Sequence, residues 1–599
     1  MREVNRFYNP VIVIRLAMLV FCGALFFLGF VLWHIQVKDT AEYSSSLDRQ
    51  SIRRVRVAGA RGRITDRNGA LLAGNRPSYC LAVYIEEVRQ PGRWGNTVAE
   101  VERILHELSA VIDLPVNVSS DDILRHIQRR LPLPFVAWRD ISPRALALWA
   151  ESPQAFPGVD IHVEPVRLYP EKGLMGHVIG HIGRADLVAA GETGYHFYEP
   201  EMEGKLGVER SFNDVLSGVS GGRLIRVDAS GMKHEEVAWR EPQSGLDLRL
   251  TLDSEVQQML ETALRGLRGA AVLLDVNSGD IIALASEPVF DPNMFSVPLS
   301  SADYRELVQD QGRPLFNRSV NAYPPGSIIK PLMGLAIVGS GRVSISTEIH
   351  CGGVFHVGNH PFHCWRRSGH GSLSLRASLA QSCNVYYYQS SLTAGYDSIY
   401  HMAAASGIGR VTGIRLPGES AGLLPDDAWK RRRNPRDGWR AGDTCNVSIG
   451  QGALLVTPLQ MAVLTAAIAN GGTIYRPRIS FAEPEAMVSS RPAWSAPVLQ
   501  EVRRGMYDSV QSERGTGRRA RVAGISMAGK TGTAQYGPAH EGRKHAWMVA
   551  YAPYEVPRYA MAIIIEDAES GGLDAAPRVQ QVMSQILERD GAVRTGGRG

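Results

Sequence analysis

The longest apolar run of the chain lies near its N-terminus. Residues 16–33 contain no charged side chain, and residues 11–14 extend the run beyond Arg15. A run of this length is sufficient to span a bilayer. It continues into a Trp-His-Ile-Gln sequence instead of a small-residue cleavage site, so the pattern predicts an uncleaved anchor rather than a signal peptide. Because arginines precede and open the run, the positive-inside rule predicts a single pass with a cytoplasmic N-terminus and the rest of the chain outside.

The pattern after the anchor predicts a first folded module that mixes strands and helices. Asn68-Gly69 lies between two apolar runs, which is a hairpin signal. Apolar positions recur with a spacing near 3.6 over residues 96–109 and 120–130, which predicts two helices. The Pro- and Gly-containing polar stretch at residues 241–247 marks the end of this module.

A second module follows, with strand patterns at both of its ends. Two apolar strands flank a turn within residues 270–286, and residues 546–553 and 558–567 form another antiparallel pair. An amphipathic helix at residues 576–591 closes the module. We expect strands from both ends to share one antiparallel sheet flanked by helices. The long segment between them predicts an inserted all-helical lobe.

Length and composition agree with this division. A chain of 599 residues is too long for a single core, and 44% hydrophobic with 21% charged residues is typical of globular domains. The net charge of +5 provides no argument for nucleic-acid binding. The predicted segments are a cytoplasmic N-terminus at 1–10, a transmembrane anchor at 11–34, a stalk at 35–60, a first module at 61–245, a second module at 246–592 and a disordered tail at 593–599.

A serine and a lysine three residues apart form a candidate for nucleophilic catalysis. In the sequence YPPGSIIKPLMGLAIV, Ser327 and Lys330 lie one turn apart at the start of a predicted helix. A serine hydroxyl needs a base to become a nucleophile, and a lysine supplies one when burial lowers its pKa. Only eight of the 65 basic residues are lysine, so each lysine is informative. Ser230 and Lys233 share this spacing, but flanking glycines and the lack of a following apolar helix predict a loop there.

Two further elements extend this candidate site. Ser382 and Asn384 supply a hydroxyl and an amide, which are suited to relay a proton and to hold a substrate amide. Residues 530–533, Lys-Thr-Gly-Thr, lead into the final hairpin. A lysine and two hydroxyls at a strand edge are suited to bind a carboxylate, and the glycine permits a close approach of the substrate to the backbone.

In the order S-x-x-K, S-x-N and K-T-G, these elements resemble the motifs of the penicillin-binding protein and serine β-lactamase superfamily. The further stretches that carry the resemblance are RGRITDRNG at 61–69, GKLGVERSFN at 204–213, VSIGQGALLVTPLQMA at 447–462 and HAWMVAYAP at 545–553. Together they resemble class B penicillin-binding proteins over nearly the whole chain, most closely the elongation type, penicillin-binding protein 2 of the rod-shape system. The resemblance implies an α+β pedestal domain of the dimerisation type, followed by an α/β penicillin-binding transpeptidase domain.

The resemblance also implies an activity, that of a serine-type peptidoglycan D,D-transpeptidase inhibited covalently by β-lactams. Ser327 is then the residue acylated by the D-Ala-D-Ala end of a stem peptide, and Lys330 is its base. Ser382 passes the proton to the leaving D-Ala, and Asn384 positions the peptide. The substrate-binding residues that it implies are Lys530, Thr531, Gly532 and Thr533. The backbone N–H groups of Ser327 and Thr533 form the implied oxyanion hole.

Location and partners follow from the same resemblance. It implies a protein of the cell inner membrane whose catalytic domain is periplasmic and acts on peptidoglycan during cell elongation. The implied partners are a SEDS-family glycosyltransferase, which contacts the anchor and the first module, and a scaffold protein of the rod system on that module. No cofactor takes part in the implied chemistry.

Other functions use the same catalytic residues. A D,D-carboxypeptidase or a β-lactamase transfers the acyl group to water, but neither needs an anchor and an additional module. A β-lactam sensor needs an intracellular signalling domain, and only about ten residues precede the predicted span. A bifunctional synthase needs a glycosyltransferase domain, for which the first module is too small. A division-specific class B transpeptidase is the nearest alternative, and the Cys-containing insertion favours the elongation type.

Cysteines and a histidine in that insertion form a candidate metal site. The residues are Cys351, Cys364, His370 and Cys383, at intervals of 13, 6 and 13. Three cysteines and one histidine suit a structural, tetrahedral zinc site. Elongation-type relatives resemble this region in carrying a zinc site with acidic, His and Cys ligands, and here Cys351 and Cys364 stand where carboxylates are found. The open alternative is a disulfide between Cys351 and Cys364, with Cys383 as a buried thiol beside Ser382.

Overall fold

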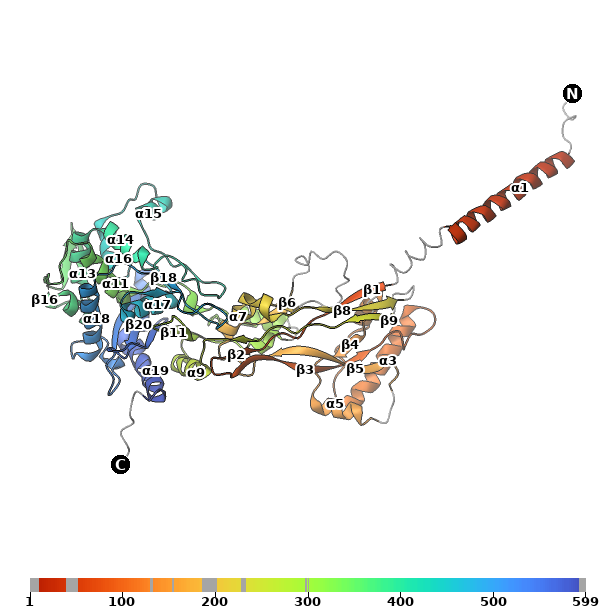
Figure 1. Cartoon of the computed structure of the whole chain (residues 1–599), viewed down its shortest axis with the longest axis horizontal. Coiled ribbons are helices and arrows are strands. Elements are labelled where there is room, and N and C mark those ends of the chain that lie inside the picture. Colours follow the sequence, from red (N-terminus) through yellow and green to blue (C-terminus); the bar gives the residue numbers. More distant parts are fainter. Residues whose placement is uncertain are drawn as a thin grey trace, which may run out of the picture.

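The computed structural model shows an elongated molecule, with the second module at one end, the first module in the middle and the apolar helix at the other end (Figure 1). The structure describes residues 10–38, 52–129, 133–152, 156–185, 202–227, 233–296, 299 and 301–591. Four of the sequence predictions lie wholly, or for at least half of their length, outside these ranges: the cytoplasmic N-terminus at 1–10, the stalk at 35–60, Ser230 of the second Ser-Lys pair, and the disordered tail at 593–599.

The apolar N-terminal run forms helix α1 (Pro10–Trp33), and a π-helical turn extends it through His34–Lys38. Its most apolar stretch has a mean hydropathy of 2.7, and none of that stretch is buried against the rest of the protein. Among the described residues it is the one helix long and apolar enough to cross a membrane. This length and exposure fit the predicted membrane anchor.

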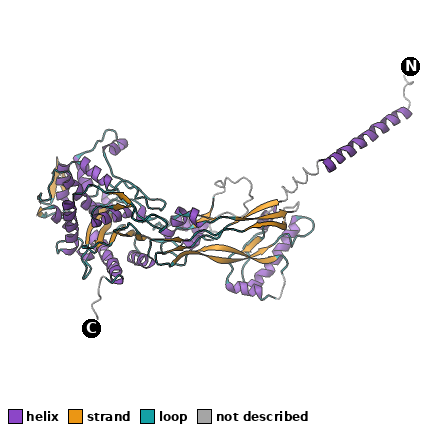
Figure 2. Ribbon diagram, in the orientation of Figure 1, coloured by secondary structure: helices purple, strands orange, loops and turns teal. Residues whose placement is uncertain are grey.

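The first module is dominated by long antiparallel strands with helices packed beside them (Figure 2). Its strands are β1 (Ile52–Val57), β2 (Ile64–Thr65), β3 (Leu71–Val83), β4 (Phe135–Trp138), β5 (Val159–Leu168), β6 (Ile182–Arg184), β7 (Met202–Gly204), β8 (Gly221–Val227) and β9 (Lys233–Arg240), and β10 (Leu248–Arg249) at the start of the second module joins its sheet. Its helices are α3 (Trp94–Ile112), α4 (Ser120–Gln128), α5 (Pro143–Ala150), α6 (Gly176–Ile179), α7 (Gly207–Ser211) and α8 (Asn213–Leu216). The predicted hairpin at Asn68-Gly69 joins β2 to β3, and both predicted helices are present as α3 and α4.

A strand pair and hydrogen bonds of Asp66 connect the two modules. β10, which follows the predicted boundary, pairs in parallel with β2. Asp66 accepts hydrogen bonds from the backbone N–H and the hydroxyl of Ser254, at 3.1 and 2.8 Å. Within the first module, the fully buried Glu209 pairs with Arg61 at 2.5 Å and with Arg167 at 2.7 Å, which ties its strands together. The pairing of β10 with β2 and the hydrogen bonds of Asp66 attach the second module to the strands of the first, in addition to the connecting chain.

The sheet of the second module combines strands from both ends of its sequence, as expected. Its strands are β11 (Gly269–Asp275), β12 (Ile281–Glu287), β19 (Ala528–Gln535), β20 (Lys544–Ala552) and β21 (Tyr559–Ile565). They lie in the order β12-β11-β21-β20-β19, and all neighbours are antiparallel. β19, which carries the Lys-Thr-Gly-Thr sequence, is therefore an edge strand.

Helices cover both faces of this sheet. Helices α9 (Ser254–Leu264) and α19 (Ala576–Arg589) pack on the face that carries Ala271 and Leu273. Helices α11 (Lys330–Gly339) and α17 (Pro458–Asn470) pack on the face that carries Val272 and Leu274. Alternating residues of β11 thus enter two separate cores, which explains why this strand is apolar at nearly every position.

The inserted lobe is helical apart from three short two-stranded ladders. The remaining helices of the module are α10 (Ser301–Gln309), α12 (Leu375–Ala380), α13 (Asn384–Ala394), α14 (Tyr396–Ala405), α15 (Asp427–Arg433), α16 (Ala441–Ser448) and α18 (Ala496–Gln511). The ladders pair β13 (Ile349–Cys351) with β16 (Gly371–Leu373), β14 (Val354–Val357) with β15 (His360–His363), and β17 (Ile474–Tyr475) with β18 (Val488–Ser490). Strands this short have too few positions for an alternating pattern to reveal them.

Candidate active site

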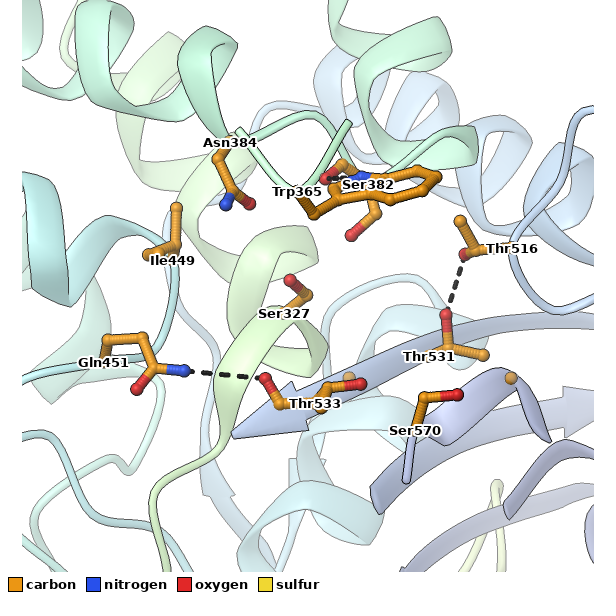
Figure 3. A pocket seen from close by; sticks show the side chains of 12 residues that line it. Ser327, Trp365, Ser382, Asn384, Ile449, Gln451, Thr516, Thr531, Thr533 and Ser570 are labelled. Atoms are coloured by element: carbon orange, nitrogen blue, oxygen red, sulfur yellow. Dashed lines mark hydrogen bonds between the residues drawn. The ribbon is translucent and has the colours of Figure 1, made fainter. Parts of the chain in front are cut away.

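The candidate nucleophile lies in a tight turn at the start of α11. Ser327 belongs to the 3-10 turn Gly326–Ile329, which continues directly into the helix. Gly326 has a φ of 57°, and a Cβ at this position would lie 2.7 Å from the carbonyl oxygen of Thr533. Glycine is therefore required where this turn meets β19. The side chain of Ser327 faces a cleft of about 380 Å³ (Figure 3).

Lys330 lies behind this cleft and is fully buried. Its ammonium group donates hydrogen bonds to the backbone oxygen of Ser382 at 2.9 Å and to the side-chain oxygen of Asn384 at 2.8 Å. Burial lowers the pKa of Lys330 to about 8, against the opposing charges of Cys383 and Cys364. A lysine with this pKa is partly neutral near physiological pH and is able to accept a proton.

Ser382 lies between two buried lysines. Its hydroxyl accepts a hydrogen bond from Nζ of Lys530 at 2.8 Å, and a longer one from Nζ of Lys330 at 3.4 Å. Ser382 has a φ of 54°, a left-handed conformation that is uncommon for serine, in the loop between α12 and α13. Such conformations persist where the surroundings fix them, and they are frequent at functional sites.

Lys530 and Thr531 form the part of β19 next to Ser382. Lys530 is fully buried, and it also donates to the backbone oxygen of Thr531 at 2.9 Å. Burial, and then the positive charge of Lys330, lower the pKa of Lys530 well below its usual value. The hydroxyl of Thr531 donates to that of Thr516 at 2.7 Å. This end of the cleft therefore combines a lysine with three hydroxyl groups.

Gly532 and Thr533 bring the edge strand against the turn that holds the nucleophile. A Cβ on Gly532 would lie 3.0 Å from the backbone nitrogen of Ile328, so a side chain here would push the two elements apart. The hydroxyl of Thr533 accepts a hydrogen bond from the backbone N–H of Gly571 at 3.3 Å. An edge strand of this kind offers backbone groups to an extended peptide.

The structure thus brings all eight predicted catalytic and substrate-binding residues to one place. The cleft is lined by Ser327, Ser382, Asn384, Thr531, Gly532 and Thr533, and the lysines Lys330 and Lys530 contact Ser382 from behind. Sequence reasoning did not identify the other lining residues, which are Trp365, Ile449, Gln451, Thr516, Ser570 and Gly572. Ile449 and Gln451 stand in the stretch 447–462 that carried the family resemblance, whereas no sequence signal marks the rest.

The four predicted metal ligands also converge. One ligand atom from each of Cys351, Cys364, His370 and Cys383 lies within 4.8 Å of all the others. Nδ1 of His370 is 3.5 Å from the sulfur atoms of both Cys351 and Cys364. Hydrogen bonds from Cys383, from His370 and from the backbone N–H of Asn384 lower the pKa of the Cys364 thiol. Cys351 and Cys364, the pair of the alternative disulfide, are free thiols in this structure.

Known proteins resemble the chain over nearly its full length. The penicillin-binding protein dimerisation domain matches residues 56–250, and the penicillin-binding protein transpeptidase domain matches residues 269–584. Peptidoglycan D,D-transpeptidase MrdA of Acinetobacter baumannii is 32% identical, over 95% of this chain and 86% of its own. The structure of PBP2 from Helicobacter pylori in complex with MreC has a TM-score of 0.77 and 29% identity, and the match covers 90% of this chain and 100% of that one.

A chain in a peptidoglycan synthase complex that coordinates polymerization and crosslinking is similar over a larger share of this chain. The match has a TM-score of 0.70 and 29% identity, and it covers 98% of this chain and 99% of the other. These matches confirm the fold that the motif resemblance implied, a single apolar helix followed by a dimerisation domain and a transpeptidase domain. The chain therefore belongs to the class B penicillin-binding proteins of the PBP2 type.

Proposed function

We propose that this protein is the peptidoglycan D,D-transpeptidase of cell elongation and that it works through an acyl-enzyme on Ser327. The observation that carries this proposal is the position of Ser382, hydrogen-bonded to two buried lysines at the wall of the cleft into which Ser327 points. The low pKa of Lys330 supports its role as the base, because the neutral amine takes the proton of Ser327 as the hydroxyl attacks the penultimate D-Ala carbonyl.

The second step is the departure of the terminal D-Ala. Its nitrogen needs a proton, and the hydroxyl of Ser382 is placed to pass one on from the lysine at its side. Lys530, Thr531 and Thr533 bind the carboxylate of this terminal residue, and the amide of Asn384 orients the stem peptide. The backbone N–H groups of Ser327 and Thr533 stabilise the oxyanion, an assignment supported by the close approach of Gly326 to Thr533.

The acyl group is then transferred to an amine of a neighbouring stem peptide, which forms the cross-link and regenerates Ser327. A carboxypeptidase or β-lactamase transfers it to water instead. We expect the purified chain, incubated with a donor ending in D-Ala-D-Ala and a labelled D-amino acid, to exchange the terminal D-Ala for the label. Mass spectrometry of the products checks this, and release of D-Ala without incorporation of label points to a hydrolase.

Acylation is expected to depend on pH through Lys330. Burial lowers the pKa of this lysine to about 8, so the neutral, basic form becomes populated at a lower pH than for an exposed lysine. The second-order rate constant of acylation by a penicillin should therefore rise from about pH 6, reach half its maximum near pH 8 and level off above about pH 9. Stopped-flow measurement across this range tests the assignment. A rate that stays constant or falls as the pH rises contradicts Lys330 as the base.

We also propose that the Cys/His cluster holds one structural zinc ion. Tetrahedral zinc with thiolate and imidazole ligands places sulfur and nitrogen about 3.5 Å apart, given the usual bond lengths. The two sulfur–nitrogen distances around His370 agree with this value. The cluster lies against the catalytic loop, since the backbone N–H of Asn384 donates to the sulfur of Cys364 at 3.4 Å. Zinc here stabilises the loop that carries Ser382 and takes no part in the reaction.

Replacing Cys383 by serine tests the zinc proposal. We expect Cys383→Ser to lower the melting temperature and the acylation rate together, and to reduce the zinc content from about one per chain. Cys445→Ser is the control, because Cys445 is also buried but lies outside the cluster. Elemental analysis and calorimetry provide the measurements. Fully active, metal-free protein with a mass lower by two hydrogens favours the disulfide and rejects zinc.

Partners and location complete the proposal. Because PBP2 of Helicobacter pylori forms a complex with MreC, and another similar chain belongs to a synthase complex, we propose a rod-system scaffold protein and a SEDS-family glycosyltransferase as partners. The arginines before the span support an inner-membrane protein with a cytoplasmic N-terminus and a periplasmic catalytic domain. The pedestal and transpeptidase domains are proposed to cover residues 61–245 and 246–592.

A further inference from the structure

Trp365 presents a large aromatic surface to the cleft. The residue is 58% exposed, and it lines the cleft together with Ser327 and Ser382 (Figure 3). Its indole N–H donates to the backbone oxygens of Gln381 and Ser382, both at 3.1 Å. The polar atom of the indole is therefore satisfied by the protein, and the ring itself is left available for an apolar ligand group.

The Cys/His cluster contacts this ring through His370. Trp365 directly follows Cys364, and its ring lies edge-on to that of His370, with 5.4 Å between centroids and an interplanar angle of 62°. Two carbonyl groups and an aromatic neighbour thus restrict the rotation of the side chain. A ring that is both exposed and held in one orientation is suited to discriminate between ligands.

Apolar surface is scarce elsewhere in the cleft. Most of the other lining side chains carry hydroxyl or amide groups, and Ile449 is the other large apolar one. The two lie apart: Ile449 is on the side of Asn384, whereas Trp365 extends above Ser382 toward Thr516 (Figure 3). A substrate that ends in D-Ala-D-Ala brings two methyl groups into this otherwise polar space.

We propose that Trp365 determines specificity for the leaving residue by contacting the methyl group of the terminal D-Ala. The inference deepens the proposed function and rests on it, because the carboxylate of the leaving residue is there assigned to Thr531 and its neighbours. Thr531 is hydrogen-bonded to Thr516, and the indole extends toward this end of the cleft. The amine that accepts the acyl group enters where the leaving residue departs, so the same ring also contacts the acceptor. Trp365 takes up no proton and forms no bond.

Two donors that differ by a single methyl group test this inference. Stem-peptide donors ending in D-Ala-D-Ala and in D-Ala-Gly are compared by the kcat/KM for release of the terminal residue, and the ratio of the two values is the readout. We expect Trp365→Ala to reduce the preference for D-Ala about fivefold, the usual contribution of one buried methyl group. Trp365→Phe keeps an aromatic surface and should stay within about twofold of the unaltered ratio.

A control variant and a second truncation distinguish specificity from a merely structural role. Trp239, 49% exposed on β9 of the pedestal, is the matched control, and Trp239→Ala should change neither activity nor ratio. Trp365→Leu should give an intermediate ratio. If Trp365→Ala and Trp365→Leu lose activity equally on both donors, with an unchanged ratio, the inference is overturned. If the unaltered chain releases the terminal residue from neither donor, the proposed function fails, and this inference with it.

Discussion

The Ser327→Ala protein is expected to form no covalent adduct with any β-lactam and to catalyse no transpeptidation. The hydroxyl of Ser327 is the atom that becomes acylated, so its removal leaves no residual pathway through the acyl-enzyme. Stability should change by no more than about 0.5 kcal/mol, because Ser327 is partly exposed and no buried partner loses a hydrogen bond. Labelling with a fluorescent penicillin, followed by gel electrophoresis, measures the first effect, and thermal denaturation measures the second.

The second Ser-Lys pair in the sequence provides a control for this experiment. Ser230 has the same spacing to Lys233 as Ser327 has to Lys330, but Lys233 begins β9 of the pedestal, far from the cleft. Ser230→Ala should therefore label at the normal rate. Persistent labelling of Ser327→Ala, in a protein with an unchanged melting temperature, would falsify the assignment of the nucleophile.

Lys330→Arg should reduce the acylation rate by about a hundredfold to ten-thousandfold, although the positive charge is kept. A guanidinium group stays protonated, so it is unable to take the proton of Ser327. Because Lys330 is fully buried, the larger side chain also strains the packing. Lys330→Met separates these effects, since it removes the base while conserving the volume.

Second-order rate constants for penicillin acylation, measured for both variants beside their melting temperatures, provide the comparison. We expect both variants to be slow, and the methionine variant to remain folded. Normal acylation of Lys330→Arg would mean that the lysine acts only through its charge. Normal acylation of Lys330→Met would mean that the lysine takes no part in acylation. In either case the proposed mechanism needs another base.

Much of the fold could be predicted because its strongest patterns are local. The apolar strands β11, β20 and β21 and the amphipathic helix α19 each carry their own periodicity, and antiparallel strands at both ends of a module have few ways to pair. The ladders of the inserted lobe escaped prediction because strands of two to four residues carry no readable alternation.

The residues of the cleft also divide into those with a local sequence pattern and those without one. Ser327, Lys330 and residues 530–533 could be found because each group lies on one turn or one strand, with a fixed spacing. Trp365 and Thr516 lie in irregular loops, and only the packing of α12, α18 and the Cys/His cluster brings them to the cleft. A single sequence contains no spacing rule for such residues, and the structure was needed to identify them.

The most direct test of the acyl-enzyme is to locate the bound β-lactam. The unaltered protein is incubated with benzylpenicillin, its intact mass is measured, and the digested adduct is mapped by tandem mass spectrometry. We predict one adduct per chain, attached to Ser327 within the peptide that contains the Ser-Ile-Ile-Lys sequence. An adduct on Ser382 or on any other residue, or an unmodified chain after prolonged incubation, would contradict the central claim that Ser327 is the nucleophile.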